Sequence, residues 1–196
     1  MFLFFAVIAL ALAVAVLIGG DVRHLSQLRI RHMELLIGAF AAKVSVALLG
    51  TTSSAAALLA ARPLNIIGAA LLLAVAWVNR RLPGALIFAA GLLSNLVVIV
   101  SFGGRMPVLL PAGLQTPAGG TLPLLRAGLD PLHVLLTHPQ GLWFLGDVFL
   151  IPGVIGRASV VSIGDVLMAA GVAYLIIRWS HRPRSAEPAY EATAAK

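Results

Sequence analysis

The sequence predicts an all-α integral membrane protein with about five transmembrane helices and a Pro/Gly-rich, partly ordered lid on the outer face, between the fourth and fifth helices. Composition supports this prediction, because the 196 residues are 60% hydrophobic and only 11% charged, far from the usage of soluble domains. The apolar residues are also grouped into runs long enough to cross a bilayer. One long segment, residues 103–158, lacks the pattern of a spanning helix, and we assign it to the lid.

The apolar runs form one predicted membrane domain over residues 1–185. The first run is interpreted as an uncleaved helix, because no positive region precedes it and Gly19, Gly20 and Asp21 follow where a small-residue cleavage site is needed. Pro63 is placed in the first turn of the third span, where proline is tolerated. The predicted spans are about 2–19, 33–50, 62–79, 83–102 and 159–179.

The predicted lid is rich in turn-forming residues and yet apolar. Seven of the eleven prolines lie between residues 101 and 165, together with hydrophobic residues such as Trp143, Phe144 and Phe149. A disordered linker does not carry so many large apolar side chains. We therefore expect this segment to fold back onto the helices.

Basic residues predict the orientation in the membrane. Nine of the fourteen Lys and Arg lie in the first loop, the third loop and the tail, against four on the opposite side, and Lys43 lies within a span. Because short loops rich in Lys and Arg stay in the cytoplasm, we expect the N-terminus outside and the C-terminus in the cytoplasm. Residues 186–196 are rich in Pro, Ala and Glu and are predicted to form a disordered cytoplasmic tail.

Several function classes are disfavoured. The net charge of +7 does not indicate nucleic-acid binding, because most of the basic residues lie at the ends of apolar runs. The chain has no cysteine, which excludes disulfides, thiolate catalysis and cysteine-based metal sites. It also lacks a phosphate loop, a serine-hydrolase elbow and a metalloprotease motif. We therefore predict no cofactor, and the sequence favours a role other than that of an enzyme.

Three polar residues within spans are candidates for a functional cluster. Helical rise places Lys43 about 13 Å, and Asn95 and Asp165 about 10 Å, below the outer ends of their spans, so all three can meet in one layer. Ionisable residues at such depth are often functional, and Lys43 and Asp165 are expected to pair. In the alternative interpretation Lys43 extends its ammonium to the interface and Asp165 only caps the fifth helix.

The lid carries the remaining candidate binding residues, which are Arg105, His133 and Asp147. Arg105 either pairs with Asp147 or Asp165 or faces a lipid phosphate, since arginine matches both groups. The glycines at 103 and 104 are interpreted as a corner of the fold.

A metal site is not predicted. His133 and His138 have Asp130 and Asp147 nearby in the sequence, but His138 lies five residues beyond His133 and Pro139 follows at once. No standard zinc spacing results. We interpret these residues as partners of the loop backbone.

Four motifs occur in order: Gly-Gly-x-Met-Pro-Val (103–108), His-Val (133–134), Leu-Gly-Asp-Val (145–148) followed by Ile-Pro (151–152), and Ser-Ile-Gly-Asp (162–165). Together they resemble a family of small bacterial membrane proteins, the domain of unknown function 5317. The resemblance implies a polytopic protein of the bacterial inner membrane and no particular activity. The sequence departs from the family pattern at Phe102, where an asparagine is expected, and this disfavours a role that needs an amide there.

Three functions are consistent with these residues. The first is an accessory subunit, or a binder of a membrane-resident lipid or quinone-like molecule under the lid. The second is a small transporter or channel with a polar centre at Lys43, Asn95 and Asp165. The third is an intramembrane enzyme acting on a lipid-linked substrate, with Asp147, Asp165 or His133 as acid or base. The expected partners are membrane lipids, other membrane subunits or a second copy of the chain.

Overall fold

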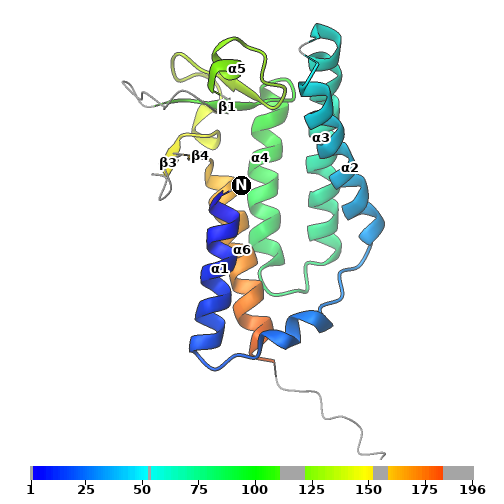
Figure 1. Ribbon diagram of the computed structural model, residues 1–196, viewed down its shortest axis with the longest axis vertical. Helices are drawn as coiled ribbons and strands as arrows, with labels where there is room; N and C mark the ends of the chain where they lie inside the picture. The colour runs from blue at the N-terminus through cyan, green and yellow to red at the C-terminus, as the bar shows by residue number, and fades with distance from the viewer. Residues whose placement is uncertain (1, 53, 111–121, 152–158, 183–196) are drawn as a thin grey trace, which may run out of the picture.

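The computed structural model describes residues 2–52, 54–110, 122–151 and 159–182, which form helices with four short strands (Figure 1). Strand β1 pairs with β2 in parallel, and β3 pairs with β4 in antiparallel. The elements are α1 (Phe2–Leu17), η1 (Val22–Gln27), α2 (Met33–Gly50), α3 (Ala55–Val78), α4 (Ala85–Ser101), β1 (Met106–Val108), α5 (Leu122–Arg126), β2 (His133–Leu135), η2 (Trp143–Leu145), β3 (Phe149–Ile151), β4 (Ser159–Val161) and α6 (Ile163–Ser180).

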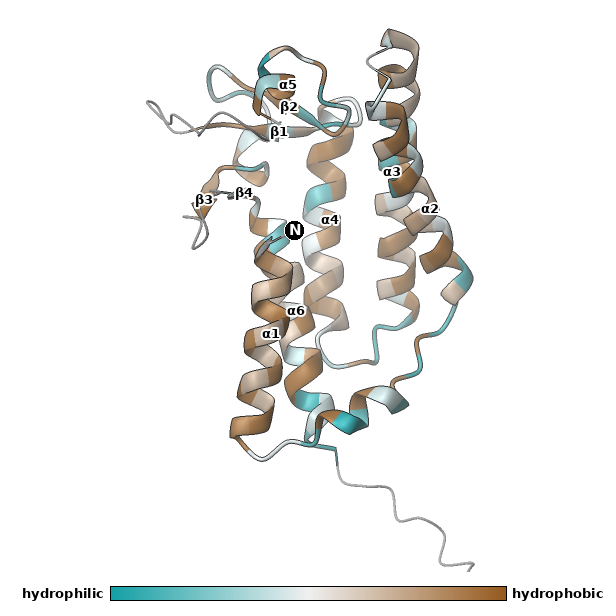
Figure 2. Cartoon of the chain, in the orientation of Figure 1, coloured by the Kyte–Doolittle hydropathy of each residue, from teal (hydrophilic) through white to brown (hydrophobic). Residues whose placement is uncertain are grey.

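Helices dominate the described residues, and three of them, α2, α3 and α6, are long and apolar enough to cross a membrane. The apolar helices α1 and α4 are shorter, with 16 and 17 residues. Figure 2 shows the helices as hydrophobic over most of their length, with hydrophilic residues concentrated in the loops. The predicted helical class is confirmed, and the structure holds three candidate membrane spans.

The five long helices pack in the order α1, α6, α4, α3, α2, each mainly against its neighbours in this series. Glycines allow α4 and α6 to approach closely. A Cβ atom added at Gly91 would collide with the carbonyl oxygen of Gly164, and one added at Gly84 would collide with that of Gly171. Seven residues separate the two glycines on each helix, so both pairs lie along one line of contact.

Hydrogen bonds hold three segments together at one end of the helices. The backbone N–H of Asp21 donates to the carbonyl of Ser180 at 2.9 Å, and the indole N–H of Trp179 donates to the carbonyl of His24 at 2.9 Å. Asn79, after α3, accepts the backbone N–H of Arg31 at 2.8 Å. The α1–α2 loop, the α3–α4 turn and the end of α6 therefore share one end of the molecule (Figure 1).

The opposite end carries the connecting segment, by which we mean the described residues between α4 and α6 (Figure 1). Met106 at the start of β1 packs with Val98 and Ile99 of α4, and Leu142 and Leu145 cover the same cluster. A bridge between Val108 and Asp147 joins β1 to the residues before β3. Apolar burial thus orders the described part of this segment against α4.

Two element boundaries differ from the sequence prediction. Helix α3 begins at Ala55 rather than near residue 62, so Pro63 lies inside it. Residues 55–61 are mostly alanine and leucine, whose high helix propensity offsets the hydrogen bond that proline removes. Helix α6 begins at Ile163 rather than near 159, because residues 159–161 form β4. The predicted disordered tail, residues 186–196, lies outside the described residues.

Candidate functional site

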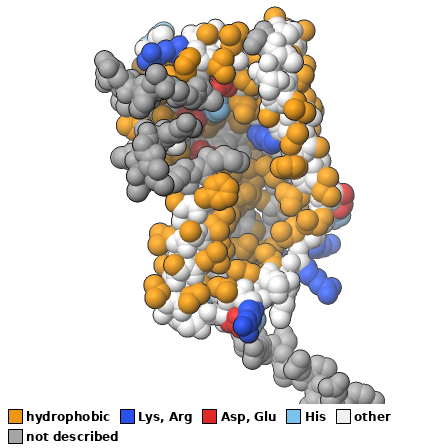
Figure 3. All heavy atoms as spheres, in the orientation of Figure 1, with side chains coloured by type: hydrophobic (Ala, Val, Ile, Leu, Met, Phe, Trp, Pro, Cys, Tyr) orange, Lys and Arg blue, Asp and Glu red, His pale blue; other side chains and the backbone are white. Residues whose placement is uncertain are grey.

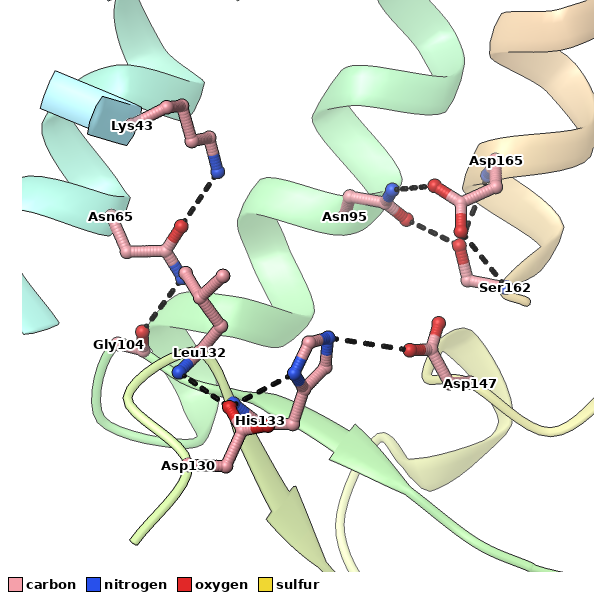
Figure 4. Close-up of polar contacts among 10 residues, drawn as sticks. All are labelled: Lys43, Asn65, Asn95, Gly104, Asp130, Leu132, His133, Asp147, Ser162 and Asp165. Carbon is pink, nitrogen blue, oxygen red and sulfur yellow. Dashed lines mark hydrogen bonds and ion pairs between the residues drawn. The ribbon is translucent and has the colours of Figure 1, made fainter. Parts of the chain in front are cut away.

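A polar pocket of about 170 Å³ lies between the helices and the connecting segment. It brings together residues from α2, α3, α4, β1, β2 and α6, and most of them are drawn in Figure 4. Four of its residues are ionisable, which is unusual for a cavity among apolar helices. The lining residues are Lys43, Asn65, Asn95, Ile99, Met106, Leu132, His133, Asp147 and Asp165.

Lys43 is held by an amide on the neighbouring helix. Its Nζ donates to Oδ1 of Asn65 at 2.7 Å, and Nδ2 of Asn65 donates to the carbonyl of Gly104 at 2.9 Å (Figure 4). Asn65 is only 2% exposed. Burying an amide is costly unless its polar atoms are bonded, so this chain of bonds fixes α2, α3 and the turn before β1 relative to one another.

Asp165 both caps α6 and joins it to α4. Its backbone N–H donates to Oγ of Ser162 at 3.0 Å, and its carboxylate accepts the backbone N–H of Ser162 at 3.3 Å, which is a capping box. The same carboxylate accepts Nδ2–H of Asn95 at 2.9 Å, while the Ser162 hydroxyl donates to Oδ1 of Asn95 at 2.9 Å. The predicted capping role therefore coexists with an interhelical one.

His133 lies between two carboxylates. Asp130 Oδ1 is 3.0 Å from His133 Nδ1, and it also accepts the backbone N–H groups of Leu132 and His133, each at 2.8 Å. On the other side, His133 Nε2 is 3.9 Å from Asp147 Oδ2 (Figure 4). Oδ1 of Asp147 is buried and has no hydrogen-bond partner among the described residues. An unpaired buried oxygen in a pocket is suited to accept a hydrogen bond from a ligand.

These positions shift the pKa values of the three groups. Burial disfavours the imidazolium of His133, but the hydrogen bond and charge of Asp130, with the charge of Asp147, raise its pKa. Burial also opposes ionisation of Asp130, yet the hydrogen bonds from His133 and the backbone lower its pKa. For Asp147, burial and then the like charge of Asp165 outweigh the attraction of His133 and raise the pKa to about 7. Asp147 therefore exchanges its proton near neutral pH.

Asp147 should make the stability of the protein fall as pH rises. Its pKa of about 7 exceeds the ordinary value of 3.8, so its contribution is fully present below about pH 4 and is lost as pH rises through 7. The effect is at most about 4 kcal/mol, and Asp147→Asn should remove it. Melting temperatures in detergent between pH 4 and 8 test this. The raised pKa of His133 also makes stability fall as pH rises, so the test is the difference in melting temperature between the parent and Asp147→Asn at each pH. If the melting temperatures of the two proteins changed in parallel with pH, the prediction would be contradicted.

The structure brings five of the six predicted binding residues to the polar pocket, namely Lys43, Asn95, His133, Asp147 and Asp165. Arg105 does not line it and forms no ion pair with Asp147 or Asp165. The predicted direct pair of Lys43 and Asp165 is wrong, since no ion pair joins them. Each charge is instead bonded to an asparagine on an adjacent helix.

Two residues of the network escaped the sequence reasoning. Asn65 is an asparagine well inside an apolar span, which is the same signal that singled out Asn95. Ser162 stands three residues before Asp165, and this spacing is typical of a capping box. His138, in contrast, lies outside the pocket, where its ring contacts the Thr137 hydroxyl at 3.0 Å. Within the ranges that the structure describes, no three His, Asp or Glu residues are arranged to hold a metal ion.

The fold and the pocket together define a small protein of apolar helices with a buried polar site near one end. The chain belongs to the Family of unknown function (DUF5317), whose model matches residues 27–177, so the predicted resemblance is confirmed. It is similar to an uncharacterized protein of Thermotoga maritima, with 34% identity over 94 residues. That match covers 48% of this chain and 51% of the relative, so the chain spans about half the length of that protein. No solved structure matches the chain.

Proposed function

We propose that this protein crosses a bacterial inner membrane with five helices and binds a membrane-resident amphiphile, a lipid or quinone-like molecule, beneath an outer lid. In this proposal the polar pocket holds the head group and the connecting segment acts as the lid. The hydrocarbon tail lies in a second, apolar pocket. The relation between the two pockets is the observation that carries the proposal.

The apolar pocket has a volume of about 210 Å³. Like the polar pocket, it is lined by α2, α3, α4 and α6, and hydrophobic side chains make up most of its wall. A small number of polar groups at one end and an apolar remainder are typical of sites for amphipathic ligands. Its lining residues are Ile30, Leu36, Leu72, Val75, Ala76, Asn79, Leu82, Pro83, Gly84, Ala85, Phe88, Gly171, Val172 and Leu175.

Each of the four helices lines both pockets with residues seven positions apart. Seven residues make nearly two complete turns and a rise of about 10 Å, so the two members of each pair share a helix face. In this proposal the two pockets are therefore parts of one groove, polar near the connecting segment and apolar beyond it. The pairs are Lys43 and Leu36 on α2, Asn65 and Leu72 on α3, Asn95 and Phe88 on α4, and Asp165 and Val172 on α6.

The surface view supports the same arrangement. Figure 3 shows a hollow between the helices, with basic, acidic and histidine side chains around its upper part and hydrophobic side chains below. The polar pocket of about 170 Å³ has room for a small head group, since one water occupies about 30 Å³ of liquid. Lys43 offers donors and Asp147 offers an acceptor, so the head should carry both oxygen acceptors and a hydroxyl.

The distribution of arginines suggests how the protein is oriented in the membrane. The end that holds the α1–α2 loop, the α3–α4 turn and the end of α6 carries Arg23, Arg29, Arg31, Arg80 and Arg81, and further arginines follow α6. Such a concentration favours a cytoplasmic location for that end. The polar pocket then lies toward the outer face of the membrane.

Filling the apolar pocket should remove the ligand. Ala85 lines this pocket, whereas Ala90, on the same helix, is exposed on another face. Organic extracts of the purified protein, analysed by mass spectrometry, should contain an amphiphile in near-stoichiometric amount from the parent. Ala85→Phe should retain at least about tenfold less, since the loss of one well-packed contact region is worth more than 1.4 kcal/mol.

The matched control is Ala90→Phe, which adds the same ring outside the groove and should retain the parental amount. Equal depletion in the two variants would contradict the proposal. An extract that contains only bulk lipids in membrane proportions would contradict it as well.

A second candidate function, acid–base chemistry on the bound head, is favoured by the position of His133 between Asp130 and Asp147. A histidine oriented by one carboxylate and facing another group that titrates near pH 7 is suited to move a proton. Mass spectrometry of organic extracts, as above, distinguishes the binding function from the enzymatic one. Under the enzyme hypothesis His133→Asn accumulates a chemically different ligand, and under the binding hypothesis the ligand keeps its mass.

A further inference from the structure

We propose that Arg62 and Arg105 form a phosphate-binding site near the connecting-segment end of α3, outside the groove. This proposal does not depend on what the groove binds. Neither arginine lines either pocket. The observations that support the site are the enforced proximity of the two residues, their buried unpaired donors and the lack of an ion pair to any carboxylate among the described residues.

The backbone forces the two arginines together. Gly104 has a φ of +92°, which favours glycine, and a Cβ atom added there would lie 2.6 Å from Cβ of Arg62 and 2.8 Å from its carbonyl oxygen. The carbonyl of Gly104 is also held by Nδ2 of Asn65, one turn further along α3. Arg105, the next residue, is therefore kept beside Arg62 by contacts that do not involve its own side chain.

Both guanidinium groups retain unpaired donors. The Nε–H groups of Arg62 and Arg105 are buried and have no hydrogen-bond partner among the residues that the structure describes. Burial lowers the pKa of Arg105, and the charge of Arg62 lowers it further, against a weaker opposing effect of Asp130. Two like charges with buried donors are costly unless an anion accepts their bonds.

The described part of the chain supplies no such anion. Ion pairs in the described part of the chain all involve histidines, and Asp130 is already bonded to His133. Residues 111–121 and 152–158, which the structure does not describe, contain no Asp or Glu. An external anion is therefore the natural partner, and the planar fork of arginine matches phosphate oxygens bidentately.

The phosphate can belong to a lipid head group or be free in solution. The two sources are distinguished by comparing the compounds that stabilise the protein. The melting temperature of the full chain in phosphate-free detergent is measured with added phosphatidylglycerol, with diacylglycerol of the same acyl chains, and with inorganic phosphate. Phosphatidylglycerol should raise the melting temperature of the parent, and diacylglycerol should not. A rise with inorganic phosphate alone would assign the site to free phosphate.

The Arg62→Gln/Arg105→Gln variant should bind the effective phosphate compound at least about tenfold more weakly, because charge-assisted hydrogen bonds are lost. The control Arg80→Gln/Arg126→Gln removes the same charge from two exposed arginines and should respond like the parent. Without phosphate, Arg62→Gln should melt no lower than the parent, since it relieves repulsion. The proposal is overturned if neither compound shifts the parent, if both double variants respond equally, or if Arg62→Gln is the less stable protein without phosphate.

Discussion

Replacing Gly164 by valine should lower the melting temperature by about 10 °C, since overpacking costs about 1–3 kcal/mol, the broken hydrogen bonds of Asn95 add to this loss, and each kcal/mol shifts a domain of this size by about 2–4 °C. A Cβ atom at Gly164 would collide with Oδ1 of Asn95 and lie 2.7 Å from the carbonyl oxygen of Gly91. The larger side chain therefore separates α4 from α6. It also breaks the bonds between Asn95 and the Ser162–Asp165 cap. Thermal unfolding in detergent measures the loss.

Ala170→Val is the matched control. Ala170 lies on the same helix but is exposed, so the added methyl groups meet no neighbouring helix. Its melting temperature should stay within a few degrees of the parent. If the two valine variants melted together, α4 and α6 would not be in the close contact described above.

Neutralising Lys43 should be the second large effect. Lys43→Met removes the ammonium that donates to Oδ1 of Asn65, so that buried oxygen loses its hydrogen bond. It also removes the positive charge that attracts the Asp165 carboxylate across the pocket. Asp165→Asn in turn weakens the hydrogen bond that the Asp165 carboxylate accepts from the Ser162 backbone N–H in the cap of α6, and the bond from Asn95. Each change should cost about 2–4 kcal/mol, in the range for breaking buried charged networks.

The double variant tests whether the two charges act on each other. Because Lys43 and Asp165 share a pocket of low dielectric without direct contact, we expect a coupling of about 1 kcal/mol, so the double variant is more stable than the sum of the single losses implies. Val44→Met, one residue along on an exposed face, should be neutral. Additive losses would show that the pocket screens the two charges completely.

Helix positions, and the level along the helices at which polar residues lie, could be predicted from the sequence because they depend on local properties. Apolar runs indicated each of the five long helices, and the helical rise correctly suggested that Lys43, Asn95 and Asp165 can meet in one layer. The largest boundary error, at Ala55, arose because Pro63 was given more weight than the alanine-rich residues before it. The class of protein and its family were thus within reach of the sequence.

The partners within the site were not predictable in the same way. Lys43 bonds to Asn65 and Asp165 bonds to Asn95, although charge alone favoured a direct pair. Asp130 became the partner of His133 through a turn whose backbone N–H groups the carboxylate also accepts. Such choices depend on the rotation of each helix about its axis and on the distance to its neighbour, which a periodic pattern does not specify.

By itself the sequence determined a helical chain with apolar helices long enough to cross a membrane, and basic residues concentrated near particular helix ends. Only the tertiary structure decided that residues of the same four helices line two pockets, one polar and one apolar. The physical reason lies in the order of the helices, which depends on non-local contacts such as Gly91 with Gly164 and Met106 with Val98. Those contacts join residues far apart in the chain, and no local pattern encodes them.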